Sequence, residues 1–110
     1  MRVVIAWWEL DGSGQSIASL RHFLRDEAVD RFSQVRGLRL KVWISDEATN
    51  RWGAVFLWES ARAAAAPIPA RAAELIGRPP TARYAFDVEA TAEGRYDTAQ
   101  LARLGLAFGI

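Results

Sequence analysis

Residues 37–59 read GLRLKVWISDEATNRWGAVFLWE, and this stretch decides the fold that the sequence predicts. Residues 38–45 and residues 51–58 alternate side chains with the period of two that is typical of β-strands. The intervening residues 45–50, SDEATN, include Ser, Asp and Asn, whose side chains bond nearby backbone groups and favour a chain reversal. We therefore expect a β-hairpin here.

The second strand of this hairpin is apolar on both faces. One face carries Trp52, Ala54, Phe56 and Trp58, and the other carries Gly53, Val55 and Leu57. Residues 2–10, RVVIAWWEL, show the same pattern and predict a first strand. Strands that are apolar on both faces must be covered on both faces, so we expect these two strands at the centre of a sheet.

The remaining segments alternate helix and strand signals. Residues 17–32 repeat apolar side chains at intervals of three and four, which predicts one amphipathic helix. Residues 61–66 are alanine-rich and favour a helix that Pro67 and Pro69 stop or kink, and residues 70–76 predict a second helical segment ending at Gly77. A last strand is expected over residues 81–90, and residues 99–107 predict a short terminal helix or arm.

The resulting order, β-α-β-β-α-β, predicts one α+β domain over residues 1–110. Right-handed crossovers give the ferredoxin-like arrangement, with an antiparallel sheet and both helices on one of its faces. That arrangement leaves an apolar sheet face without cover. An isologous homodimer is the commonest way to cover such a face, so a homodimer is expected.

Composition excludes several classes of function. The chain of 110 residues has a formal net charge of +1 with no basic patch, which argues against nucleic-acid and membrane-surface partners, and no apolar run approaches the length of a membrane span. Cysteine is absent and one histidine is present, so we expect neither disulfides nor a metal site, and no cofactor. The cytoplasm is the expected location. Two motif interpretations are disfavoured: Gly12-Ser13-Gly14 lacks the third glycine of a dinucleotide fingerprint, and the third strand lacks the stacking aromatics of an RNA-recognition motif.

A few side chains could carry chemistry. Lys41 and Trp43 lie two residues apart on one strand face, where a cation and an aromatic ring could contact a ligand or could guard a sheet edge. His22 is the one histidine, about 140° round the helix from its apolar stripe, and solvent exposure competes with proton transfer as its role. The tryptophans could form core, dimer interface or a substrate box.

The hairpin resembles the YdhR-like monooxygenases, which are related to the small antibiotic-biosynthesis monooxygenases. The residues that carry the resemblance are Gly37 to Trp43, the loop from Asp46 to Asn50, and Trp52 to Ser60. The resemblance implies a dimeric α+β barrel with a pocket between helices and sheet, in which O₂ oxidises a phenolic or quinone-like polyketide without metal or flavin. Trp58 resembles the pocket tryptophan of that family, whereas Ala54 stands where other members have asparagine.

The leading hypothesis is therefore a cofactor-independent monooxygenase for an aromatic or polyketide-like small molecule. In it Lys41 stabilises a phenolate or enolate, Trp43 and Trp58 stack on the substrate rings, and His22 transfers a proton. Trp7 and Phe56 complete the expected aromatic contacts. The alternatives are a cofactor-free cyclase or isomerase of secondary metabolism, and a non-catalytic dimer that binds a small molecule. The alanine-rich helix offers little side-chain volume, which is compatible with a pocket between that helix and the sheet and equally with a closely packed helix.

Overall fold

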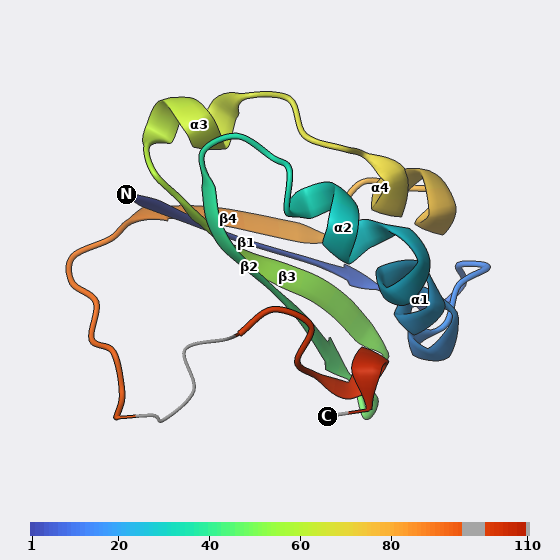
Figure 1. The fold of residues 1–110 in the computed structure, drawn as a ribbon. Coiled ribbons are helices and arrows are strands. Elements are labelled where there is room, and N and C mark those ends of the chain that lie inside the picture. The colour runs from blue at the N-terminus through green and yellow to red at the C-terminus, as the bar shows by residue number, and fades with distance from the viewer. Residues whose placement is uncertain (96–100, 110) are drawn as a thin grey trace.

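A four-stranded antiparallel sheet organises the structure, a computed structural model that describes residues 1–95 and 101–109 (Figure 1). Its strands are β1 (Arg2–Glu9), β2 (Leu38–Asp46), β3 (Arg51–Trp58) and β4 (Ala82–Asp87), in the spatial order β2-β3-β1-β4. The two strands that are apolar on both faces, β1 and β3, occupy the centre, as predicted from the sequence. This small α+β fold is compatible with the ferredoxin-like arrangement.

The first helical region has a wide turn at its middle. It consists of α1 (Ile17–Phe23), the π-helical turn η1 (Leu24–Ala28) and α2 (Val29–Phe32), where the sequence predicts one regular helix over residues 17–32. Ser16 caps α1, because its hydroxyl accepts a hydrogen bond from the backbone N–H of Ser19. The prediction of a helix is thus confirmed, and the π turn is an addition that periodicity did not show.

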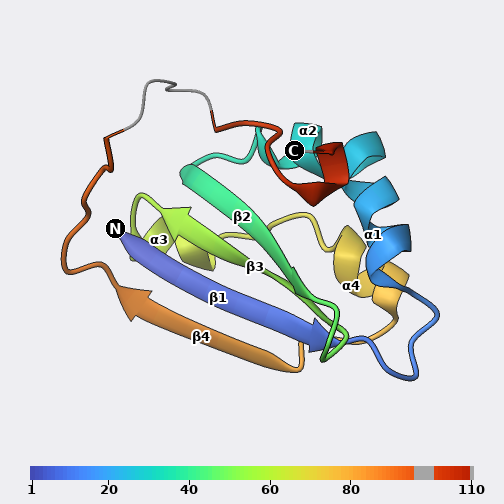
Figure 2. The ribbon, with the colours of Figure 1, turned by 90° about the horizontal axis from the view of Figure 1, so that it is seen from below.

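The second helical region is broken in two by the prolines, as expected. α3 (Ala61–Ala65) begins after the capping Ser60, and α4 (Arg71–Ile76) ends at Gly77, whose φ of 89° is the left-handed conformation that glycine favours. All these helices lie on one side of the sheet, and Figure 2 shows the sheet in front of α3 and α4, seen from the opposite side.

The core fills the space between the helices and the sheet. The helix-facing side chains of β3, namely Trp52, Ala54, Phe56 and Trp58, are all buried. Trp52 packs with Leu20 and Leu24 of the first helical region, whereas Phe56 and Trp58 pack with Phe32 at the other end. α3 lies over this second cluster through small side chains, Ala63 and Ala64, so that helix and sheet approach closely.

The opposite face of the sheet is apolar and, within the part of the chain that the structure describes, no helix covers it. Its most exposed members are Leu40 (39%), Val42 (46%), Ile44 (41%), Tyr84 (53%) and Phe86 (53%). Tyr84 and Phe86 of β4 point to this uncovered face, because they pair with Ile5 and Val3 of β1 and share their side of the sheet.

The C-terminal segment is an arm along the helix side of the molecule and contains little helix. Residues 101–105 are irregular, and only the 3-10 turn η2 (Leu106–Phe108) is helical, while residues 99 and 100 of the expected helix lie outside the described residues. Arg103 has a φ of 65° and Gly105 a φ of 121°, and these values interrupt any helix. Ala107 is buried in the core beside Leu24 and Trp52.

Gly53 permits the close packing of the two central strands, so Gly53→Ala should destabilise the protein. A Cβ at this position would lie 2.6 Å from Trp7 Cβ and still closer to the carbonyl oxygen of Ala6, which belongs to the paired strand and cannot move away cheaply. We expect a loss of about 1–3 kcal/mol or more in the free energy of unfolding, measured by urea denaturation. Gly14→Ala is the matched control, because nothing lies within 4 Å of its Cβ position. Equal stability of the two variants would contradict this account.

Candidate functional site

A cavity of about 920 Å³ lies between β2, the first helical region and the C-terminal arm. This volume falls in the range of about 300–1,000 Å³ that is usual for small-molecule sites. Of the two alternatives for the alanine-rich helix, a pocket or close packing, the structure shows close packing. The small alanine side chains let α3 pack directly against the cluster that contains Trp58, and the cavity lies beside the first helical region instead.

Lys41 is one of the charged residues that line the cavity. Its Nζ lies 3.2 Å from the ring centroid of Phe32, 4.4 Å from that of Phe56 and 4.5 Å from that of Trp43. Phe32 and Trp43 are themselves packed edge to face, with centroids 5.7 Å apart. Three aromatic side chains from α2, β2 and β3 thus hold one amine, which we call the Lys41 cage.

Burial within the Lys41 cage lowers the pKa of the amine. Burial disfavours the ammonium form and brings the pKa of Lys41 from 10.5 to about 7. The ring faces act in the opposite direction, since they attract a cation. Among the described residues, Lys41 has neither an ion pair nor a hydrogen bond that would restore the charge, so both protonation states are accessible at neutral pH.

The other charged side chains that line the cavity are all cationic: Arg21, Arg39 and Arg103. Arg21 pairs at 3.4 Å with Glu47, which is not among the lining residues. The remaining walls are mostly apolar, with Leu24, Val29 and Trp43 facing Leu104 and Leu106 of the arm. An apolar cavity edged with positive charge suits a hydrophobic molecule that carries or can develop negative charge.

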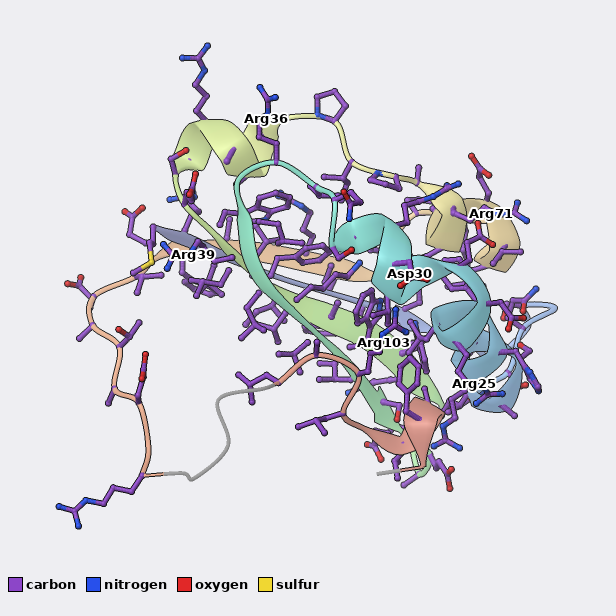
Figure 3. The ribbon with its side chains drawn as sticks, in the orientation of Figure 1. Arg25, Asp30, Arg36, Arg39, Arg71 and Arg103 are labelled. Carbon is purple, nitrogen blue, oxygen red and sulfur yellow. The ribbon has the colours of Figure 1, made fainter. Side chains whose placement is uncertain are left out.

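The arm is held over the cavity by contacts with the first helical region (Figure 3). Arg25 donates a hydrogen bond of 2.7 Å from Nη1 to the backbone oxygen of Ala107. Arg103 forms an ion pair with Asp30, and its guanidinium lies 5.7 Å from the ring centroid of Phe108. These contacts make residues 101–108 one wall of the cavity.

Two of the predicted site residues, Lys41 and Trp43, line the cavity together. Phe56 contacts the Lys41 amine from the buried side and belongs to the cage. Trp58 does not line the cavity. It is 2% exposed and stacks on Phe56 with ring centroids 5.9 Å apart, so it supports the cage from behind.

His22 and Trp7 lie away from this site. His22 is exposed, and its Nδ1 is 2.9 Å from Nη2 of Arg25, which is the residue that ties down the arm. Trp7 points to the uncovered face of the sheet, with its ring centroid 5.7 Å from that of Tyr84. The structure therefore does not bring the predicted proton-transfer residue next to Lys41.

Sequence reasoning did not assign Phe32, the three arginines or the C-terminal arm to this site. Phe32 lies on the apolar stripe of the helix and was assigned to the core, which its 7% exposure supports, yet its ring also lies closest to the Lys41 amine. One feature of the sequence indicates that the arm packs against the protein: it contains the apolar residues Leu101, Leu104 and Leu106, which a solvated tail would not need. Nothing local linked that pattern to β2.

The described residues contain neither a metal-binding cluster nor a membrane-spanning helix. Within residues 1–95 and 101–109, no three His, Cys, Asp or Glu side chains gather in a way that could hold a metal ion. No helix in the described ranges is both long and apolar enough to cross a membrane.

The lowered pKa of Lys41 predicts a pH-dependent gain in stability for Lys41→Met. Between the folded pKa of about 7 and the unfolded value near 10.4, the unfolded chain binds a proton that the folded chain does not, so wild-type stability rises with pH across this window. Methionine carries no charge, so it removes the free-energy cost of burying the ammonium. That cost is fully present below pH 7, where the folded chain keeps Lys41 protonated. We expect a gain of roughly 2–4 kcal/mol at pH 6 that shrinks towards pH 10, measured by urea denaturation at each pH.

The matched control for this measurement is Arg62→Met, which removes an exposed cation on α3 and should change stability equally at every pH. A gain for Lys41→Met that does not vary with pH would show that the amine keeps its ordinary pKa.

No protein-family model matches this chain, and no curated protein matches it. The resemblance to the YdhR-like monooxygenases therefore stays a prediction from the hairpin residues.

Proposed function

We propose that this protein binds an aromatic or polyketide-like small molecule with an acidic phenol or enol group and oxidises it with O₂ without a cofactor. The observation that carries the proposal is the amine of Lys41, which has no hydrogen-bond or ion-pair partner among the described residues and lies on an apolar cavity whose other charged lining residues are arginines. Monooxygenase activity is the reaction that the hairpin resemblance suggests for such a site.

The proposed chemistry begins with a proton transfer. The neutral amine of Lys41 takes the proton of the phenol or enol, which leaves an ammonium beside a phenolate in a poorly hydrated site. A base with a pKa near neutrality suits this step, and Arg39 adds positive charge at the cavity edge. Trp43 provides a ring on which a planar substrate can stack.

The oxidation then uses the substrate's own electrons. The phenolate is electron-rich and reduces O₂, and a ring methylene becomes a carbonyl while the second oxygen atom leaves as water. The protein contributes orientation, exclusion of water and the proton acceptor. A cyclase or isomerase would use the same proton transfer from an enol and would need no oxygen, so turnover without oxygen separates the two reactions.

We also propose that the protein is a homodimer in the manner of a dimeric α+β barrel. The apolar sheet face formed by β2, β3, β1 and β4 supports this proposal, because a folded chain in water rarely leaves so continuous an apolar surface uncovered. Two copies related by a twofold axis would each present this face to the other.

Ligand binding is testable through Trp43. We expect 2-naphthol and anthrones to quench tryptophan fluorescence, and O₂ uptake to follow with anthrones or hydroquinones in metal-free buffer. Trp43→Phe should weaken binding by about 1–3 kcal/mol through loss of the stacking surface, as judged by titration. Trp7→Phe is the matched control, since Trp7 lies on the other face of the sheet. Equal effects of the two variants would contradict a site at β2, and absence of oxygen uptake with bound anthrone would contradict the oxidation.

The homodimer is testable by light scattering of the purified chain. We expect a dimer mass for the wild type and a monomer mass for Phe86→Asp, because a charge at a 53% exposed position costs little in one chain and much in a buried apolar interface. Ala61→Asp, at an exposed position on the helix side, should leave the dimer intact. A wild-type chain that stays monomeric at high protein concentration would refute the proposal.

A further inference from the structure

The amine of Lys41 has the surroundings of a nucleophile as well as those of a base. Its Nζ rests on the rings of Phe32, Trp43 and Phe56 and, among the described residues, has no acceptor to which it donates. No fully buried side-chain nitrogen in the described part of the chain is without a partner, so the unpartnered Nζ keeps some solvent-accessible surface. Lys41 is also one of the residues that line the cavity, and these two observations are the basis for contact between Nζ and a bound molecule.

Carbonyl compounds are the partners that such an amine selects. A neutral amine adds to an aldehyde or ketone to give a carbinolamine, which loses the elements of water to give an imine; no electrons are transferred. The lowered pKa of Lys41 leaves a substantial fraction of neutral amine at neutral pH, and burial is the classical means by which proteins activate lysine for this reaction. The rings of the cage would stabilise the protonated imine as they stabilise the ammonium, because both are cations over aromatic faces.

We propose that Lys41 forms an imine with aromatic aldehydes or ketones bound in the cavity between β2, the first helical region and the C-terminal arm. The apolar walls suit an aromatic ring, and Trp43 lies beside the nitrogen where that ring would stack. The reaction uses the cavity of the proposed function but needs neither oxygen nor a phenol.

The composition of the chain makes this proposal unusually easy to test. Lys41 is the one lysine among 110 residues, and the chain has no cysteine. The other primary amine is the α-amino group of Met1, which is 50% exposed and lies on no wall of the cavity. An adduct found by mass spectrometry therefore belongs to Lys41 or to Met1, and peptide mapping separates these two.

The experiment is reductive trapping at pH 7 without oxygen. The full chain is incubated with 2-naphthaldehyde and sodium cyanoborohydride, which reduces the imine to a stable secondary amine. We expect an adduct at Lys41, formed on the order of 10–100 times faster than at a surface lysine, because an ordinary lysine near pKa 10.4 is almost fully protonated at this pH. The rate at Lys41 should rise with pH through about 7 and then level off.

The matched control is the double variant Lys41→Arg, Arg62→Lys. It keeps one lysine and the same charge but moves the amine to an exposed position on α3. Trapping at position 62 as fast as at position 41 would overturn the proposal. If the double variant does not fold, the wild type supplies its own control: the preference for Lys41 over Met1 should disappear in urea, and a preference that survives denaturation, or never exists in the folded chain, refutes the inference.

The outcome is distinguishable from that of the proposed function. Binding of 2-naphthol without trapping of naphthaldehyde would refute imine formation and leave phenol binding in place. Trapping at Lys41 without oxygen uptake from anthrones would support the imine and refute the oxidation. 2-Naphthol should slow trapping at Lys41 but not at Met1, because only the former amine lies in the cavity.

Discussion

The burial of the Lys41 amine is the constraint on which the site depends. Strand β2 has aliphatic side chains on one face and Lys41 and Trp43 on the other, and a slip of one residue would exchange the two faces. The observed pairing of Lys41 with Phe56 and of Trp43 with Ala54 turns the lysine towards the helices and leaves Leu40, Val42 and Ile44 on the open face. In a single chain this is the costlier choice, because a cation is desolvated while aliphatic groups remain in water. Both costs would be offset if the cavity binds an anionic ligand, which would pair with the ammonium, and if a second copy of the chain covers the aliphatic face.

The π turn explains how Phe32 reaches the amine. The buried stripe of the first helical region runs through Leu24, Ala28 and Phe32 in steps of four residues. On a regular α-helix each such step overshoots a full turn by about 40°, so the stripe would rotate away from the sheet. The wider turn η1 contains two of these positions and reduces the overshoot. Phe32 therefore still faces β2 and lies 3.2 Å from Lys41 Nζ.

The sequence predicted the elements well because their signals are local. Alternation in residues 38–45 and 51–58 and the helix end at Gly77 are each properties of a few neighbouring residues, and the structure has all of them. Alternation also predicted that Lys41 and Trp43 share a face. Alternation could not tell which face of the sheet the helices cover, because the central strands β1 and β3 are apolar on both faces. That choice depends on contacts between distant segments.

The site was harder to predict because it depends on side-chain volume and on the arm. The alanine-rich helix was compatible either with a pocket or with close packing, and the structure shows close packing: a Cβ at Gly37 would lie 2.6 Å from Ala63 Cβ. Trp58 is consequently sealed, and the free volume lies beside the longer first helical region. There Arg25 and Arg103 fix the arm through contacts that span more than seventy residues, which no local pattern reveals.

The cavity and the proposed dimer face share strand β2. β2 is an edge strand, and the cavity extends round it, so that Val42 and Ile44 of the open face belong to the cavity lining together with Lys41 and Trp43. A second copy seated on the open face would therefore border the cavity and would exclude water from the side that the arm does not cover. Less water around Lys41 favours the neutral amine further and strengthens the attraction between its ammonium and a bound phenolate. Dimer formation and the chemistry of Lys41 are thus expected to depend on each other through the same side chains of β2.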